Sequence, residues 1–285
     1  MTVEVHRPTS LAEALALRSA HPGATPICGG TDLMVELNFD KARPEIVIDL
    51  TACPELQQWS RSNGAIHIGA GVTYTRLIAE LATELPGLAI ASRTVGSPPI
   101  RNRGTLGGNL GTASPAGDGV PPLVAVDAEV ELASNAGTRS MPVAEFITGV
   151  KEHALRDDEL IIAIQVPVAR GPQQFSKIGT RNAMVIAVAT FAIALDLEAH
   201  SVGTALGSCS PRPLRAEAAE AFVGAELDWE RRSPLSRGLA ERFGELVAGV
   251  ARPIDDVRGS AAYRKHALKV MAGRTLQWAW DEASA

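Results

Sequence analysis

The chain has 285 residues, of which 46% are hydrophobic, and this length allows two domains that each have a core. A net charge of −5 at pH 7 excludes the basic surface with which nucleic-acid-binding proteins hold phosphates. No apolar run reaches the roughly 18 residues of a membrane span and no signal peptide is visible, so we expect a cytoplasmic protein.

The first fifty residues alternate strand-like and helix-like segments, which indicates a small α/β unit. Ser10 and Glu13 form a capping box at the start of the first helix. The expected segments are a strand over 3–6, a helix over 11–19, a strand over 25–28, a helix over 33–39 and a strand over 46–48.

A glycine pair interrupts this unit where its second strand ends and its second helix begins. Gly29 and Gly30 form this strand-to-helix turn. Gly-Gly at such a turn lets a phosphate approach backbone amides and the amino terminus of a helix. We therefore predict a phosphate site in the first turn, which consists of Ile27, Cys28, Gly29, Gly30, Thr31, Asp32 and Leu33.

A second unit begins near residue 56. Asn63-Gly64 predicts a hairpin between strands over 57–61 and 65–68, and helices are expected over 73–81 and 88–93. The turn Gly69-Ala70-Gly71 lacks the third glycine of a dinucleotide-fold fingerprint, because the bulky Tyr74 stands at that position. We interpret it as a tight turn.

A long stretch from Thr94 to Asp118 is rich in glycine and proline, and we expect it to be neither helix nor ordinary strand. Gly104, Gly107 and Gly108 lack a Cβ, so their backbone can take positive φ and lie close to a ligand, and successive N–H groups of such a turn form a nest for an anion. Long unstructured loops are uncommon in compact domains, which disfavours a plain surface loop. Neutral donors are added by Thr105, Asn109, Thr112 and Ser114.

The remaining chain continues the second unit and then forms a third. Pro167–Gln173 is the best candidate linker between them. Before it we expect a helix or turn over 121–126, a strand over 129–133, a turn over 135–137 and a strand over 159–166; after it, antiparallel strands over 188–197 and 202–206 and helices over 214–222, 235–250 and 261–280.

The titratable side chains show no catalytic or metal site. Cys28, Cys53 and Cys209 stand singly, without the spacing of zinc or iron–sulfur ligands, and the six histidines share no ligand spacing. Any redox chemistry would therefore come from a bound cofactor. Lys177, one of five lysines, follows the linker and either faces the ligand or pairs with a surface acid.

Several segments, in the same order, resemble the FAD-binding medium subunits of molybdenum hydroxylases, the family of carbon monoxide, xanthine, nicotine and quinoline dehydrogenases. The first turn is similar to the family's Ala-Gly-Gly-Thr-Asp-Leu loop, with Cys28 in place of alanine. Residues 100–109 and 113–118 resemble its second flavin loop, and 177–187, 211–215 and 263–266 resemble later landmarks. Pro98-Pro99 and Val185 depart from the family pattern, which usually has a polar pair and an aspartate there.

The resemblance implies an α+β fold with two domains. A vanillyl-alcohol-oxidase-like FAD-binding domain over 1–170 would consist of α/β parts over about 1–55 and 56–170. A C-terminal α+β domain over 175–285 would carry an antiparallel sheet and helices.

The resemblance also implies how FAD is bound. Its pyrophosphate would lie between the first turn and residues 105–109, Asp118 would accept hydrogen bonds from ligand hydroxyls, and Lys177 would approach the polar edge of the flavin. The implied binding set is Ile27, Cys28, Gly29, Gly30, Thr31, Asp32, Leu33, Ile100, Gly104, Thr105, Gly107, Gly108, Asn109, Ser114, Asp118, Ile161 and Lys177, with Ile161 against the flavin.

By the same resemblance, a large partner subunit would hold the molybdenum cofactor and a small one would hold two [2Fe–2S] clusters, in a dimer of heterotrimers. This chain would pass electrons through FAD to an external acceptor. One alternative is a self-contained flavoenzyme, for which only two tyrosines and no convergent histidines are available as catalytic groups. Another is a scaffold that has lost its flavin, which the intact glycine-rich loops oppose.

Overall fold

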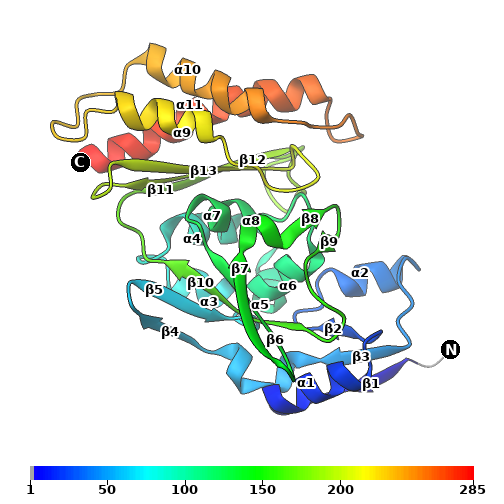
Figure 1. Cartoon of the computed structure of the whole chain (residues 1–285). Coiled ribbons are helices and arrows are strands. Elements are labelled where there is room, and N and C mark those ends of the chain that lie inside the picture. The colour runs from blue at the N-terminus through cyan, green and yellow to red at the C-terminus, as the bar shows by residue number, and fades with distance from the viewer. Residues whose placement is uncertain (1–2) are drawn as a thin grey trace.

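The computed structural model describes residues 3–285, which fold into three consecutive parts, each with its own cluster of buried apolar side chains (Figure 1). We call these the first part (3–57), the second part (58–167) and the third part (173–284). The predicted fold class is confirmed: two α-and-β parts are followed by an antiparallel sheet with helices.

The first part is the predicted β-α-β-α-β unit. Its parallel sheet has the order β1-β3-β2 and is followed by two short 3₁₀ helices, η1 (Leu50–Ala52) and η2 (Pro54–Gln57). Ser10 caps α1 as predicted. The Glu13 carboxylate accepts the N–H of Thr9 at 2.7 Å, one residue before the N-cap N–H that it would accept in a capping box. The elements are β1 (Glu4–His6), α1 (Leu11–Ala20), β2 (Thr25–Ile27), α2 (Leu33–Asn38) and β3 (Ile46–Asp49).

The second part is built on a five-stranded antiparallel sheet of order β4-β5-β10-β6-β7. The predicted hairpin turn is present, with φ of 51° at Asn63 and 74° at Gly64. The elements are β4 (Trp59–Ser62), β5 (Ala65–Gly69), α3 (Tyr74–Glu80), α4 (Pro86–Thr94), α7 (Val120–Ala125), β6 (Glu129–Ser134), β7 (Gly137–Pro142), α8 (Val143–Phe146), β8 (Ile147–Gly149), β9 (Glu152–His153) and β10 (Leu160–Pro167).

Two short helices lie in the stretch from Thr94 to Asp118, so the prediction of an irregular loop there is wrong. They are α5 (Pro98–Arg103) and α6 (Leu106–Thr112). Proline fits the first turn of α5, where a helix needs no amide donors, and the Thr105 hydroxyl caps α6 by accepting the Gly108 N–H at 3.0 Å. Gly104, Gly107 and Gly108 do not use the positive φ that is open to glycine; among glycines of this stretch only Gly96 takes it, at 46°.

The third part packs three helices on one face of a three-stranded antiparallel sheet (Figure 1). The opposite face of that sheet contacts α4 and α7 of the second part. The elements are β11 (Gln173–Ile178), β12 (Ala189–Asp196), β13 (Ser201–Gly207), α9 (Glu217–Glu226), α10 (Arg237–Val250) and α11 (Ala261–Ser284). Helix α9 begins later than predicted because Leu214 still pairs with Leu206 at the end of the sheet.

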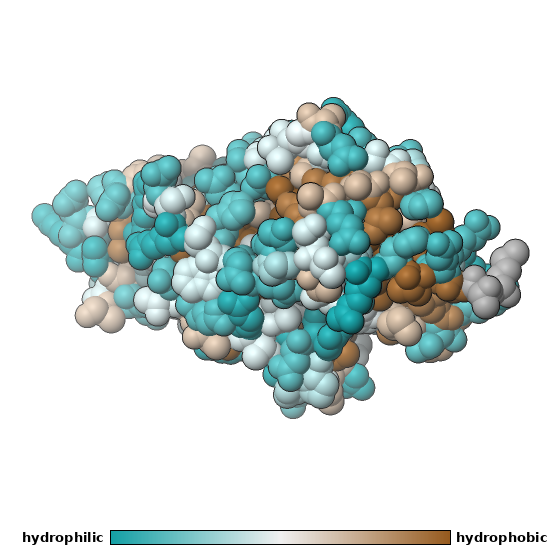
Figure 2. All heavy atoms as spheres, turned by 90° about the horizontal axis from the view of Figure 1, so that it is seen from below, coloured by the Kyte–Doolittle hydropathy of each residue, from teal (hydrophilic) through white to brown (hydrophobic). Residues whose placement is uncertain are grey.

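The surface is largely hydrophilic when the molecule is viewed from below (Figure 2). Hydrophobic surface is visible beside the amino terminus, the part of the chain in which Val3 and Val5 are exposed. Within residues 3–285, no helix combines the length and the apolar character that a membrane span requires.

Candidate functional site

A cavity of about 820 Å³ is bounded by residues from all three parts of the chain. The first turn and helix α6 supply much of its wall, together with Ile100 of α5 and the start of β10. Every binding residue expected from the sequence lies in this wall except Lys177. Segments far apart in the sequence therefore converge on a single site.

The first turn presents unpaired backbone amides to the cavity. Gly30 has a φ of 75°, which glycine adopts without strain, and the chain then enters α2 at Leu33. Within residues 3–285, no hydrogen-bond acceptor faces the amides of residues 29–33. Free N–H groups at a helix amino terminus bind anions, so this turn can hold a phosphate.

The glycine-rich stretch over residues 100–118, which contains α6 and which we call the second loop, packs so closely on its neighbours that no side chain fits between them. A Cβ on Gly29 would lie 2.1 Å from the backbone oxygen of Arg103. A Cβ on Gly107 would lie 2.5 Å from the Cβ of Ala70. Close approach of backbone to backbone, rather than positive φ, is what these two glycines provide.

The amides of the second loop are mostly engaged within the protein. Leu106 donates to the oxygen of Val72 at 3.3 Å, and Gly107 donates to the oxygen of Ala70 at 3.0 Å. The N–H of Gly108 is taken by the Thr105 hydroxyl. The second loop therefore forms a wall of the cavity, and the free amides for an anion come from the first turn.

Three buried oxygen atoms in the cavity wall have no partner within residues 3–285: the hydroxyl of Tyr74, Oδ1 of Asn109 and Oδ1 of Asp118. Burial, with the charges of Asp118 and Asp32, raises the pKa of Tyr74, so its phenol remains a donor. Buried polar groups are normally hydrogen-bonded. A ligand with several hydroxyl or amide groups would supply hydrogen-bond partners for these three oxygens.

Asp118 forms an ion pair with a buried lysine. Lys177 Nζ lies 2.5 Å from Asp118 Oδ2 and 3.2 Å from the oxygen of Thr94, and both charged side chains are more than nine-tenths buried. Burial raises the pKa of Asp118, and the charge of Lys177 opposes that rise. The sequence left open whether Lys177 faces the ligand or a surface acid; its partner is an acid, and that acid is buried.

Several wall residues were not predicted, among them Arg18, Tyr74, His153, Met184 and Arg258. His153 stacks on Phe146 with ring centroids 5.6 Å apart, its Nδ1 is buried without a partner, and burial lowers its pKa. Because His153 is a single histidine without a recognisable spacing to other ligand-type residues, the sequence does not predict that it lies in the cavity wall. Tyr74, whose bulk disfavours a dinucleotide-fold fingerprint, lies in the cavity wall with its hydroxyl unpartnered within residues 3–285.

These features fit an extended ligand that combines phosphate with hydroxyl groups. The free amides suit the phosphate, the unpartnered oxygens suit the hydroxyls, and apolar side chains such as Ile161 suit a ring. Within residues 3–285, no group of three or more His, Cys, Asp or Glu side chains is placed to hold a metal ion. The donor set matches FAD.

Comparison with known families gives two matches that together cover most of the chain. Residues 1–169 match the FAD binding domain in molybdopterin dehydrogenase, and residues 174–279 match the CO dehydrogenase flavoprotein C-terminal domain. The nicotinate dehydrogenase FAD-subunit of Eubacterium barkeri is 36% identical over 241 residues, which are 80% of this chain and 81% of that protein. The carbon monoxide dehydrogenase medium chain of Hydrogenophaga pseudoflava is 28% identical over 284 residues, 97% and 96% of the two chains.

Solved structures agree with these matches. Carbon monoxide dehydrogenase from Hydrogenophaga pseudoflava, in a form that lacks the Mo-pyranopterin moiety of its molybdenum cofactor, superposes with a TM-score of 0.90 at 29% identity. The superposition covers 99% of each chain.

Proposed function

Because this chain belongs to the family of FAD-binding subunits of molybdenum hydroxylases, we propose that it is the electron-transfer subunit of such a complex. Bound FAD would accept electrons from [2Fe–2S] clusters on a partner and deliver them to an external acceptor. Hydroxylation of the substrate would take place at a molybdenum cofactor on another subunit. The chain is thus an oxidoreductase component without a substrate site of its own.

The observation that carries this proposal is the cradle formed by the first turn against α5. Residues 29–33 line the cavity and their amides donate to no acceptor within residues 3–285, and the backbones of Gly29 and Arg103 approach too closely for any side chain. A phosphate held by backbone amides and a helix dipole needs no lysine or arginine. This arrangement supports placing the FAD pyrophosphate at the first turn.

We assign the other wall residues by their chemistry. Tyr74, Asn109 and Asp118 would bind the hydroxyl groups of FAD through their unpartnered oxygens, and Ile161 would pack against its ring. Lys177 would act through Asp118, since it lies behind that carboxylate and outside the cavity wall. The domain limits that we propose remain 1–170 for FAD binding, with parts over about 1–55 and 56–170, and 175–285 for the C-terminal domain.

Partner subunits would dock close to the cradle. Helix α2, which begins at the first turn, leaves Met34 and Val35 half exposed, and Phe39 directly after it is 71% exposed. Exposed apolar side chains clustered on one short helix are typical of an interaction surface. We propose that a large molybdenum subunit and a small iron–sulfur subunit assemble with this chain into a cytoplasmic dimer of heterotrimers.

A self-contained flavoenzyme is the second candidate function. It would need an acid, a base or a nucleophile aimed at a substrate beside the flavin. Among the titratable groups of the cavity wall, Asp118 is engaged with Lys177 and Glu159 with Arg139, whereas Tyr74 and His153 each keep an unpartnered polar atom. The pairing of the two carboxylates favours the electron-transfer function.

Purification of the chain with its natural partners tests the proposal. We expect a stable complex that contains one FAD per copy of this chain, together with molybdenum and iron. Photometry of the flavin after substrate addition should show reduction in the complex and no reduction in the isolated chain. Reduction of the isolated chain by an organic substrate would instead support the self-contained flavoenzyme.

A further inference from the structure

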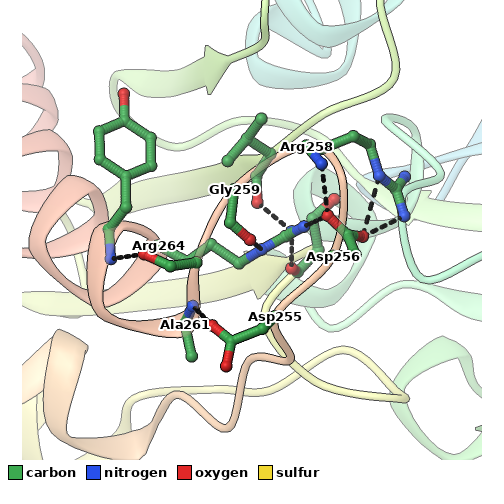
Figure 3. Close-up of polar contacts among 10 residues, drawn as sticks. Asp255, Asp256, Arg258, Gly259, Ala261 and Arg264 are labelled. Atoms are coloured by element: carbon green, nitrogen blue, oxygen red, sulfur yellow. Dashed lines mark hydrogen bonds and ion pairs between the residues drawn. The ribbon is translucent and has the colours of Figure 1, made fainter.

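The third part of the chain contributes a short wall to the cavity, which we call the C-terminal wall, made of Met184, Val185, Ile186 and Arg258. The first three side chains are apolar, so Arg258 supplies the charge of this wall. It lies on the loop that precedes α11, and its side chain is 36% exposed (Figure 3).

Arg258 is fixed on one side only. Its Nε and Nη2 both donate to Asp256 Oδ2, at 3.0 and 2.7 Å, and its backbone N–H donates to Oδ1 of the same carboxylate at 2.8 Å. Nη1 donates to no acceptor within residues 3–285. A guanidinium held by two of its nitrogens is preorganised to offer the third to a ligand.

Asp256 is in turn held by a buried arginine. Arg264, whose side chain is 3% exposed, donates from Nη2 to Asp256 Oδ1 at 2.7 Å. Its Nη1 donates to the oxygens of Val188 and Ser208, at 2.6 and 3.0 Å (Figure 3). Arg264 thus joins the loop of Arg258 to the ends of the strands beside the C-terminal wall.

The cluster of Arg258, Asp256 and Arg264 carries a surplus of positive charge, and Arg258 is its member in the cavity wall. Arg258 and Arg264 carry two positive charges against the single negative charge of Asp256, and these contacts lower the pKa of Asp256 to about 2, which keeps it ionised. Asp255 is exposed and turns toward the amino end of α11, where it accepts the Ala261 N–H (Figure 3). By contrast, the buried pair of Lys177 and Asp118 is neutral as a unit.

The C-terminal wall adjoins the end of the second loop. Ser208 donates its N–H to the oxygen of Pro115 at 2.8 Å, and Lys177 reaches Asp118 in the same segment. The free amides for phosphate belong to the first turn, in a different part of the chain. The proposed phosphate site therefore consists of amides of the first turn and does not include Arg258.

We propose that Arg258 binds negative charge at the C-terminal wall of the cavity, an inference that rests on the proposed function. Two sources can supply this charge. The ring gains one negative charge when it takes up two electrons and one proton, and an acceptor such as a nicotinamide dinucleotide carries a pyrophosphate. Either negative group would accept a hydrogen bond from Nη1 of Arg258.

The test compares the purified complex with its Arg258→Met and Arg258→Lys variants. If the ring is the source, Arg258→Met lowers the midpoint potential of bound FAD and Arg258→Lys restores most of it. If the acceptor is the source, Arg258→Met raises the KM for NAD⁺ about tenfold and leaves the KM for a neutral quinone unchanged. Thermal unfolding and FAD content establish that each variant is folded and loaded.

Arg252→Met is the matched control, because this arginine donates to the backbone oxygens of Gly249 and Ala251 and lies outside the cavity wall. It should change neither quantity. The inference is overturned if Arg258→Met retains both the potential and the KM for NAD⁺, or if Arg252→Met has the same effect. Failure of the proposed function would appear separately, as a wild-type complex without FAD.

Discussion

Substitution of Gly29 by alanine tests the contact between the first turn and α5. The new Cβ would lie 2.1 Å from the oxygen of Arg103, 2.7 Å from its carbonyl carbon and 2.9 Å from Cα of Gly104. All three atoms are backbone, so no flexible side chain can move aside. Since ordinary contacts of this kind are about 3.5 Å, the two loops must separate by about 1 Å or more.

This separation should weaken FAD binding more than it affects the rest of the fold. Overpacking of this kind costs about 1–3 kcal/mol. If the cost falls on the closed cradle, the Kd of FAD rises by about 5- to 150-fold. Titration of the deflavinated protein with FAD, followed by quenching of flavin fluorescence, measures this change.

Gly249→Ala is the matched control, because its Cβ would meet no atom within 4 Å and it lies in helix α10. It should leave the Kd unchanged and stabilise the fold by about 0.5–1 kcal/mol, since alanine is the better helix former. A folded Gly29→Ala protein that binds FAD as tightly as the wild type would refute the account of the cradle.

Three further substitutions test the buried contacts. Lys177→Met leaves the Asp118 carboxylate without its cation and should lower the midpoint potential of bound FAD in the neutral and alkaline range; adding Asp118→Asn should restore it, and a potential that never moves contradicts the role of the pair. Arg139→Met removes bonds of 2.6 and 2.7 Å to Glu159, whose pKa this arginine lowers, and should cost about 1–3 kcal/mol in urea unfolding at pH 7. The cost should shrink as the pH falls through the pKa of Glu159, which then becomes neutral; an equal loss at all pH values would be inconsistent with this. Gly244→Ala places a Cβ 2.2 Å from the backbone of α11, so it should lower the melting temperature without changing the Kd of FAD in the protein that remains folded.

Much of the fold follows from local sequence signals. Ser10 and Thr73 cap helices, and Asn63-Gly64 makes the hairpin, because the chemistry of each residue acts on its immediate neighbours. Helices α5 and α6 escaped prediction because glycine and proline usually end regular structure. Here the prolines occupy a first turn and the glycines serve packing between segments distant in sequence.

The sequence predicts those residues of the site that act through the local backbone. It does not predict contacts between side chains that are distant in sequence. The glycine pair identifies the first turn in the sequence, and this turn lines the cavity. Spacing alone cannot tell that Lys177 meets Asp118, or that Arg258 reaches the same cavity, because the packing of the third part on the second decides both. His153 is a single residue without a pattern, and only the tertiary structure places it.

Flavin analysis of the purified protein tests the central claim most directly. An absorption spectrum, followed by acid release and identification of the chromophore, measures what the cavity holds. The account predicts non-covalent FAD at about one per chain. A protein that contains no flavin and takes up none from an excess of FAD, both as the isolated chain and in complex with its partners, would contradict it.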